Sequence, residues 1–260
     1  MPALDIQSQF GLDGRVMVIA GASSGIGRAM AGFLAAAGAS VVLVARREAE
    51  LQDAAKEIHA SGTGGNASVV AADLTDFASV ADTAHRCERA FGKVDGVINA
   101  MGINLRQPVD EVTVADWNQT LHLNLSAPFF FSREFVKGMK QRRYGRIINI
   151  ASLQSVRADV NGLAYGAAKG GVRQLTRAMA EAWSRHHITC NAIAPGVFPT
   201  RLTRVIFDDP EKAAEKAART AIGRNGEMAD LFGATIFFAS PASGYITGQT
   251  LFVDGGYTAK

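Results

Sequence analysis

Seven short runs of apolar, often β-branched residues alternate with longer segments of helical spacing, and this alternation constrains the fold more than any other feature of the sequence. The runs are nearly continuous in their apolarity, as expected of strands that are covered on both faces. They are Val16–Ala20, Val41–Val44, Val69–Ala71, Val94–Asn99, Arg146–Ile150, Ile188–Ile193 and Thr250–Val253. The helical segments include Glu48–His59, Phe77–Phe91, Val114–Gln141, Tyr165–His186 and Met228–Ala239. Such alternation predicts an α/β fold, a doubly wound parallel sheet of about seven strands with helices on both faces.

The domain organisation follows from how little interrupts this pattern. No linker-like stretch, internal repeat or low-complexity tract divides the 260 residues, so we expect one domain over residues 1–260. The one irregular region is Pro195–Asn225, which is rich in charged residues and alanine. It is long enough to form a lid over a substrate or a mobile helical insertion.

Charge and cysteine content exclude several classes of protein. The net charge of +3 comes from 27 basic and 24 acidic residues spread along the chain, which favours an anionic small ligand over nucleic acid. Cys87 and Cys190 stand alone, which is typical of a reducing compartment and argues against a metal site. Met1–Phe10 lacks the apolar core of a signal peptide, and the uncharged segment Ala29–Ala45 is too short to span a bilayer. We therefore expect a cytoplasmic protein with no membrane partner.

The first strand runs into a glycine-rich turn that precedes an alanine-rich helical stretch. Glycines here allow the backbone to turn sharply and to approach a pyrophosphate, whose charge then lies at a helix N-terminus. A plain strand–helix turn can have the same composition, but the position after the first strand of an alternating chain favours a Rossmann-type dinucleotide site. The predicted cofactor contacts in this turn are Gly21, Ser23, Ser24, Gly25, Ile26 and Gly27.

The end of the second strand bears on the choice between NADP and NAD. A dinucleotide fold often places an Asp or Glu roughly 20 residues after the turn, where it binds the adenosine ribose 2′-hydroxyl. This chain has Ala45 followed by Arg46 and Arg47 there, and two guanidinium groups suit a 2′-phosphate. These arginines favour NADP(H). A solvated basic turn, paired with Glu48 and Glu50, is the alternative and leaves NAD(H) possible.

A candidate for proton transfer combines a phenol, an ammonium group and a hydroxyl. Tyr165 and Lys169 are four residues apart, hence on one face of a helix. The lysine cation is expected to lower the tyrosine pKa from its ordinary value near 10. A tyrosine and a lysine at this spacing often occur by chance, and the default interpretation is a pair on the protein surface. Ser152, however, follows an apolar strand at the end where open α/β sheets bind their ligands.

These motifs, in this order, resemble those of the short-chain dehydrogenase/reductase family, and the match covers nearly the whole chain. The family's Thr-Gly-x3-Gly-x-Gly appears with Ala20 in the Thr position, and its Asn-Asn-Ala-Gly appears as Asn99-Ala100-Met101-Gly102. These two departures affect the cofactor loop and leave the proton-transfer groups intact. The resemblance implies further cofactor contacts at Asp73, Leu74, Asn99, Ala100, Gly102, Tyr165, Lys169, Pro195, Gly196, Val197 and Thr200. The C-terminal signature matches Gly248-Gln249 and Val253-Asp254-Gly255-Gly256.

The resemblance also implies a reaction, in which hydride passes between a nicotinamide and a carbinol carbon. Tyr165 would take or give the hydroxyl proton, Ser152 would hold the reacting oxygen, and Lys169 would bind the nicotinamide ribose. Asn124, at a helix irregularity, would fix a water that passes the proton to solvent. The implied catalytic residues are thus Asn124, Ser152, Tyr165 and Lys169. The resemblance further implies a homodimer or homotetramer.

Three functions are compatible with these motifs: an oxidoreductase for a sugar acid or polyol, a 3-oxoacyl-carrier-protein reductase, and a non-catalytic nucleotide-sensing protein. The complete catalytic set argues against the sensor. A basic run could dock a carrier protein, although a solvated or subunit-facing helix end explains it equally well. The run consists of Arg133, Lys137, Lys140, Arg142 and Arg143.

Polar side chains near the predicted site favour the sugar acid, because a long acyl chain needs apolar walls. Arg106 offers a fork for a carboxylate, and Gln154 offers hydrogen bonds to hydroxyl groups. The run Ser152–Ser155 is similar to that of gluconate 5-dehydrogenases within the family. We therefore predict that a keto-gluconate is reduced with NADPH, unless Arg106 pairs with Asp110 or Glu111 instead. The predicted substrate contacts are Arg106, Ser152, Gln154 and Tyr165.

Overall fold

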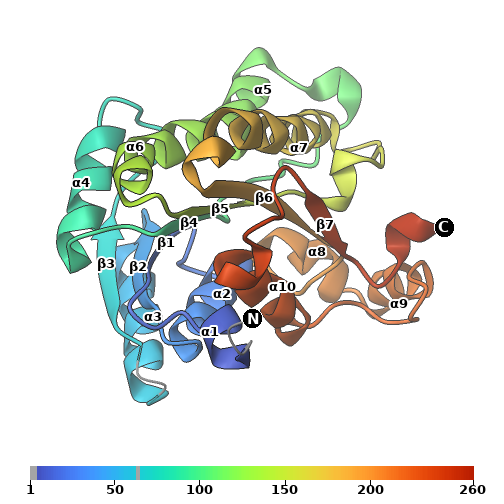
Figure 1. Cartoon of the computed structure of the whole chain (residues 1–260). Helices are drawn as coiled ribbons and strands as arrows, with labels where there is room; N and C mark the ends of the chain where they lie inside the picture. The colour runs from blue at the N-terminus through green and yellow to red at the C-terminus, as the bar shows by residue number, and fades with distance from the viewer. Residues whose placement is uncertain (1–4, 63–64) are drawn as a thin grey trace.

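All seven predicted strands are present, and they form one parallel sheet. The computed structural model describes residues 5–62 and 65–260. The strand order is β3-β2-β1-β4-β5-β6-β7, with every pair parallel (Figure 1). The strands are β1 (Val16–Ala20), β2 (Ser40–Ala45), β3 (Ala67–Ala71), β4 (Gly96–Asn99), β5 (Gly145–Ile150), β6 (Ile188–Pro195) and β7 (Thr250–Val253). The predicted single-domain, doubly wound Rossmann-type sheet is confirmed.

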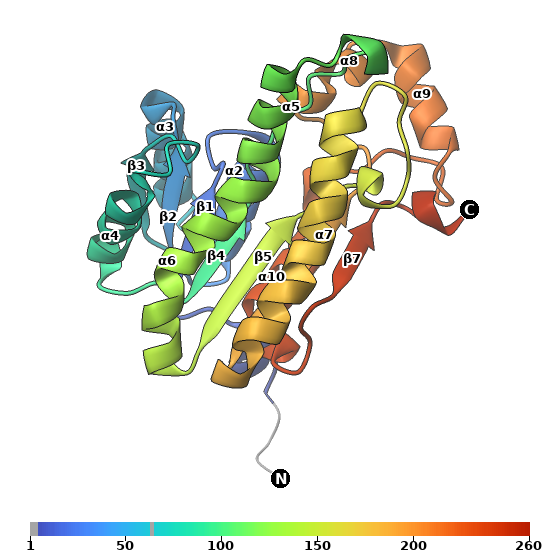
Figure 2. The same cartoon turned by 90° about the horizontal axis from the view of Figure 1, so that it is seen from above.

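Helices cover both faces of this sheet (Figure 1). One face carries α2 (Gly25–Ala36), α3 (Glu48–Ala60) and α10 (Phe232–Ala239), with the short α1 (Ile6–Phe10) nearby. The other face carries α4 (Val80–Phe91), α5 (Val114–Leu121), α6 (Ala127–Arg142) and α7 (Leu163–Trp183). The small helices α8 (Arg204–Phe207) and α9 (Pro210–Ala218) lie beyond the carboxyl ends of the strands (Figure 2).

Alternate residues of the central strands enter two apolar cores. Met17 and Ile19 of β1 belong to the core with α2, α3 and α10, whereas Val16 and Val18 belong to the core with α4, α6 and α7. Each fully buried large apolar side chain contributes roughly 1.5–3 kcal/mol to stability. Every residue of β1, β4, β5 and β6 is buried. This burial on both faces is the physical reason that the strands are continuous apolar runs in the sequence.

The edge strands differ from this pattern. Leu251 of β7 is 40% exposed, and β3 is mostly half-buried. An edge strand has a neighbouring strand on one side only. The prediction that all seven runs are covered on both faces is therefore wrong for β7.

The predicted helix Val114–Gln141 is present but is interrupted. Between α5 and α6, residues His122–Ser126 form a π-helical turn. In such a turn each backbone hydrogen bond spans one residue more than in an α-helix, and these turns are frequent at functional sites. The predicted helix irregularity at Asn124 is confirmed.

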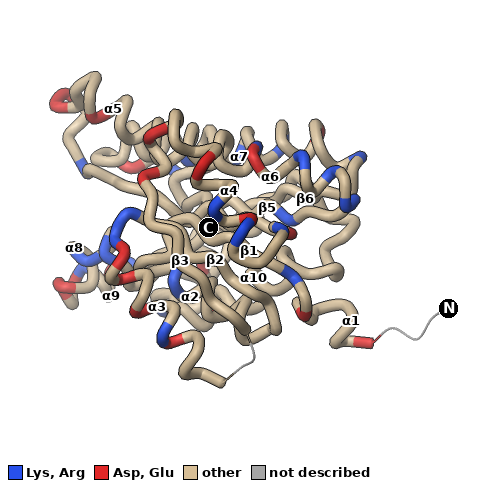
Figure 3. The backbone as a smooth tube through the Cα atoms, turned by 90° about the vertical axis from the view of Figure 1, so that its left-hand side faces the viewer, with Lys and Arg blue, Asp and Glu red and all other residues tan. Residues whose placement is uncertain are grey.

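Charged residues of both signs are distributed over the outer helices and loops (Figure 3). No helix in the described ranges is both long enough and apolar enough to cross a bilayer. Nor do the described side chains include a group of three or more His, Cys, Asp and Glu that could hold a metal ion. Cys87 and Cys190 are buried free thiols, and burial raises the pKa of Cys87 to about 12.

Two glycines allow β1 to turn tightly into α2. Gly21 has a φ of 88°, and a Cβ on it would lie 2.7 Å from the backbone nitrogen of Met101. A Cβ on Gly27 would lie 2.3 Å from the carbonyl oxygen of Gly21. Both neighbours are backbone atoms, which cannot move aside as the end of a side chain can. The close packing of this turn therefore requires glycine at both positions.

We expect Gly27→Ala to lower the free energy of unfolding by about 1–3 kcal/mol, the usual cost of overpacking. Gly32 in the same helix provides the control, because a Cβ there meets nothing within 4 Å. Gly32→Ala should instead stabilise by about 0.5–1 kcal/mol through helix propensity. Urea unfolding of the two variants measures the contrast, and equal stabilities would contradict the close approach of Gly27 to Gly21.

Candidate active site

A cavity of about 950 Å³ opens at the carboxyl ends of the strands, where open parallel sheets bind their ligands. Its wall combines the segments that follow the strands with residues of the 195–225 region. Most of the predicted site residues line it: Gly21, Ser23, Ser24, Gly25, Ile26, Arg46, Arg47, Asp73, Leu74, Ala100, Gly102, Arg106, Ser152, Gln154, Tyr165, Lys169, Pro195, Gly196, Val197 and Thr200. The fold thus gathers residues from the whole length of the chain on one concave surface.

Three predicted site residues lie behind this wall. Gly27 packs against the first glycine of the turn. The amide nitrogen of Asn99 donates to Asn149 Oδ1 (2.8 Å) and to Ser132 Oγ (2.9 Å) in the interior. Asn124 is fully buried. The structure places all three next to the site, and their roles toward cofactor or proton stay predictions.

Basic and hydroxyl side chains meet at the β1–β2 end of the cavity. Arg47 Nη2 donates to Ser23 Oγ at 3.0 Å, and Arg47 Nε lies 2.7 Å from Glu50 Oε1. Arg46 is exposed, with Nη1 at 3.7 Å from Asp73 Oδ2. Of the two arginines, therefore, Arg47 pairs with a predicted glutamate, while Arg46 turns toward the loop after β3. Both stay at the cavity wall.

The three predicted proton-transfer groups come from adjacent elements. Ser152 follows β5, and its Oγ accepts from the backbone N–H of Gln154 (3.2 Å) and is hydrogen-bonded to the Tyr165 side chain. Tyr165 and Lys169 lie one turn apart on α7, with Lys169 Nζ 5.7 Å from the centre of the phenol ring. The same Nζ donates to the carbonyl of Ile150 at 2.6 Å. The lysine is thereby held beneath the end of β5.

The pKa of Tyr165 differs from the sequence-based expectation. Burial raises it above its ordinary value, and the hydrogen bond with Ser152 and the charge of Arg106 offset this only in part. Burial also lowers the pKa of Lys169 to about 8. The expectation that the tyrosine pKa lies below 10 is wrong here, because desolvation of the phenol outweighs the lowering by Ser152 and Arg106. A phenol in this environment keeps its proton at neutral pH.

Asn124 joins the π-helical turn to the loop after β4. Its Oδ1 accepts from the backbone N–H of Ile103, and its Nδ2 donates to the Ile103 carbonyl, both at 2.8 Å. A Cβ on Gly102 would lie 3.0 Å from the same Oδ1, so the loop approaches the amide as closely as glycine allows. The Asn124 amide therefore fixes the part of the wall that faces Lys169.

Arg106 belongs to the same loop and lines the cavity. Its φ of 53° lies in the left-handed region that non-glycine residues seldom adopt. Its Nη2 donates to the carbonyl of Leu202 at 3.2 Å. Neither Asp110 nor Glu111, the partners considered from the sequence, forms an ion pair with it in the described structure. The guanidinium thus remains without a carboxylate partner at the wall.

Basic side chains outnumber acidic ones at this wall. Nine Lys and Arg residues line the cavity against two Asp, although the whole chain carries only +3. Several of them are neutralised by neighbours, as Lys212 is by Asp209 (2.9 Å). Arg106 and Lys169 form no ion pair with a carboxylate side chain in the described part of the chain, whereas Arg157 donates from Nη1 to the main-chain oxygen of Lys260 at 3.2 Å. An anionic ligand would therefore meet the guanidinium of Arg106 with no carboxylate competing for it.

Five of the lining cations were not predicted: Arg157, Arg201, Lys212, Lys216 and Arg219. The last three follow one another at spacings of four and three residues, which places them on one side of a helix. That spacing is visible in the sequence. The sequence does not indicate, however, that this side of the helix faces a site formed by strands far away in the chain.

The region predicted as a lid contains a 3₁₀ turn (Arg201–Thr203), α8 and α9. Residues from all three line the cavity. Thr200 N-caps the 3₁₀ turn, accepting from the Thr203 backbone N–H at 3.3 Å. The segment thus contains the helices that one of the two predictions expected, and its motion over a substrate stays a prediction.

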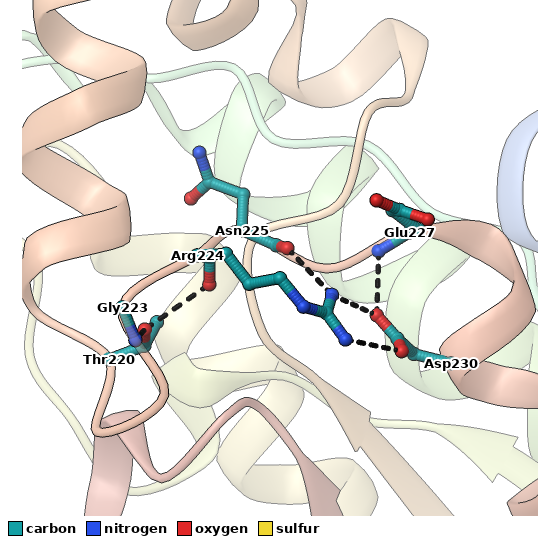
Figure 4. Close-up of polar contacts among 6 residues, drawn as sticks. All are labelled: Thr220, Gly223, Arg224, Asn225, Glu227 and Asp230. Carbon is teal, nitrogen blue, oxygen red and sulfur yellow. Dashed lines mark hydrogen bonds and ion pairs between the residues drawn. The ribbon is translucent and has the colours of Figure 1, made fainter.

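The end of this segment is fastened by an ion pair (Figure 4). Arg224 binds both oxygens of Asp230, at 2.6 and 2.8 Å. The same carboxylate accepts from the backbone N–H of Glu227 at 2.8 Å, and the Thr220 hydroxyl donates to the Arg224 carbonyl at 3.2 Å. The hydrogen bonds from Arg224 lower the pKa of Asp230 to about 2. This anchor consequently stays ionised at neutral pH.

Comparisons with known proteins agree with the geometry. Residues 21–258 match the family model described as enoyl-(acyl carrier protein) reductase. Gluconate 5-dehydrogenase of Gluconobacter oxydans (strain 621H) is 39% identical over 251 residues, which cover 96% of this chain and 97% of that protein. The chain thus belongs to the short-chain dehydrogenase/reductase family of oxidoreductases.

Two further similar proteins differ from each other in the activity that their names state. The crystal structure of a gluconate 5-dehydrogenase from Burkholderia cenocepacia J2315 in complex with NADP and tartrate matches with a TM-score of 0.92 and 38% identity, covering 98% of this chain and 100% of that one. A 3-oxoacyl-[acyl-carrier-protein] reductase of Escherichia coli (strain K12) is 34% identical over 244 residues, covering 94% of this chain and 97% of that protein.

The lowered pKa of Lys169 implies that the stability of the folded protein depends on pH. The folded protein releases this proton near pH 8, while the unfolded chain holds it to about 10.5. The unfolded state therefore binds more protons in that interval, so stability rises with pH there and the full cost of burying the cation is present below pH 8. We expect Lys169→Met to be more stable than the parent at pH 7, by about 1–3 kcal/mol.

This advantage should shrink as the pH rises from about 8 toward 10.5. Urea unfolding of both proteins at pH 7 and pH 10, without added nucleotide, measures it. Lys212→Met is the control, because Lys212 is exposed and its pKa is raised by Asp209. A stability difference for Lys169→Met that stays constant with pH would refute the assignment.

Proposed function

We propose that this protein is an NADP(H)-dependent oxidoreductase that interconverts a secondary alcohol and a ketone on a sugar acid such as gluconate and 5-keto-gluconate. The observation that carries the proposal is Arg106, an uncompensated guanidinium at the cavity wall whose charge reaches Tyr165. It offers a fork for a substrate carboxylate beside the proton donor. The gluconate 5-dehydrogenases among the relatives support the same substrate class.

The cavity fits a dinucleotide in its chemistry. The glycine turn leaves no room for a Cβ at Gly21 or Gly27, and it opens α2, whose N-terminus favours a pyrophosphate. Ser23 and Arg47 supply donors beside that turn, and the exposed Arg46, whose pairing with Asp73 is long at 3.7 Å, would meet a 2′-phosphate. Four of the similar solved structures hold NADP. A bound nicotinamide would supply or accept the hydride.

The chain's own residues would handle the proton. In reduction, Tyr165 Oη gives its proton to the ketone oxygen, which Ser152 Oγ holds in place. The raised pKa of Tyr165 suits this direction, because the phenol is protonated at neutral pH. Lys169 and Asn124 would help return a proton from solvent to the phenol. Such a positioned donor contributes about 10²–10⁴ in rate.

A 3-oxoacyl-carrier-protein reductase is the alternative, and one relative carries that activity in its name. The basic run considered as a carrier dock gives it little support. Arg143 follows α6 at the edge where β5 begins, about 28 Å along the helix from Asn124. A carrier bound there would lie far from the cavity mouth. The complete catalytic set continues to disfavour a nucleotide sensor.

Three further features belong to this proposal. The chain would act as a homodimer or homotetramer, and the exposed Leu251 of β7 leaves that sheet edge open to a partner. The protein would work in the cytoplasm, where thiols such as those of Cys87 and Cys190 stay reduced. The 195–225 region would close over the substrate as a lid.

The cofactor preference is testable at the two arginines. Arg46→Ala should weaken NADPH binding about tenfold while leaving NADH nearly unchanged, because a contact to the 2′-phosphate is lost. Arg47→Ala should weaken both, because Arg47 contacts Ser23 in the pyrophosphate turn. Fluorescence titration with each nucleotide gives the dissociation constants. A parent protein that binds NADH more tightly than NADPH would end this assignment.

The substrate class is testable at Arg106. The parent should turn over 5-keto-gluconate faster than a 3-oxoacyl thioester, and Arg106→Ala should raise KM for the keto acid about tenfold or more. Arg204→Ala serves as the control, because Arg204 lies in the same lid region but pairs with Asp208 on the exterior. Preference for the thioester, or an unchanged KM in Arg106→Ala, would overturn the proposed substrate.

A further inference from the structure

Gln154 lines the cavity two residues after Ser152 and carries an unexplained polar atom. Its Oε1 is buried and has no hydrogen-bond partner among the described residues. Its backbone N–H is bound to Ser152 Oγ (3.2 Å), so the residue is tied directly to the reacting end of the site. A buried polar atom without a partner is uncommon and points to a constraint on its side chain.

That constraint comes from Gly162, the residue that precedes α7. A Cβ on Gly162 would lie 2.3 Å from Gln154 Oε1 and 3.0 Å from its Nε2. Gly162 has a φ of −123°, which any residue adopts, so the backbone does not require glycine here. The room for the Gln154 amide exists only because residue 162 has no side chain.

The amide has a preferred orientation in this space. Gly162 N-caps α7 without a side-chain cap, so the N–H groups of the first turn give that end of the helix a partial positive charge. This charge favours the amide oxygen over the NH₂ group next to it. Nε2 makes no hydrogen bond with the described residues, so the donor end of Gln154 is available to a ligand in the cavity that this residue lines.

We propose that Gly162 is a positioning residue that determines substrate specificity through Gln154. It accommodates the amide oxygen and thereby directs the Gln154 NH₂ toward an acceptor oxygen of the substrate, a hydroxyl or carboxylate. A side chain at position 162 displaces the amide and weakens recognition of that oxygen, while the proton-transfer groups stay in place. This inference rests on the proposed oxidoreductase function and adds a determinant of its substrate binding.

A double-mutant cycle tests the proposal with the full chain and NADPH. Gly162→Ala should raise KM for 5-keto-gluconate about fivefold, the value of one hydrogen bond, with kcat within about twofold of the parent. Gln154→Ala should raise KM by a similar factor. In the double variant the two effects should not add, because Gly162→Ala has no amide to displace.

Gly166→Ala is the matched control, since its Cβ would meet the same Oε1 at 3.7 Å, an ordinary contact. It should leave KM unchanged, and the melting temperature of every variant shows whether the fold is intact. An unchanged KM in Gly162→Ala, or the same fold-change in the Gln154→Ala background, overturns the inference. If the parent prefers a 3-oxoacyl thioester, the proposed substrate fails separately, and the same cycle on that ketone still measures the coupling between the two positions.

Discussion

The parallel arrangement of the seven strands is the constraint on which the site depends. Parallel strands end at one edge of the sheet, and each must be followed by a loop or a helix N-terminus at that edge. Gly21 after β1, Arg46 after β2, Ser152 after β5 and Gly196 after β6 are therefore neighbours in space although they span most of the chain. The buried central strands hold this edge rigid.

Burial then decides the electrostatics of the reacting groups. Lys169 is kept in the interior by its hydrogen bond to the Ile150 carbonyl, and the cost of desolvation lowers its pKa. The same low-dielectric surroundings raise the pKa of Tyr165. The pKa of the phenol rises and that of the ammonium falls, so burial disfavours the charged form of both side chains. A neutral phenol suits proton donation to a ketone oxygen.

Positive charge is concentrated at the cavity wall, although the net charge of the whole chain is only +3. The cations of α9 and of the loops after β2, β4 and β5 converge on one wall, while most acidic partners lie on the outside. The guanidinium of Arg106 is left without a carboxylate partner in the described structure, and that of Arg157 donates to the Lys260 oxygen. An anionic cofactor and an anionic substrate can share such a surface with little mutual repulsion.

The sequence by itself determined the strand and helix order, because residues buried on both faces must be apolar in continuous runs and glycine must occupy the tight turn. It also located Ser152, Tyr165 and Lys169, whose spacing reflects a strand end and one helical turn. The tertiary structure alone decided which cations are neutralised, which direction the Tyr165 pKa takes, and which side chain packs against Gly162. These properties depend on distances between segments remote in the chain and on desolvation, neither of which local pattern encodes.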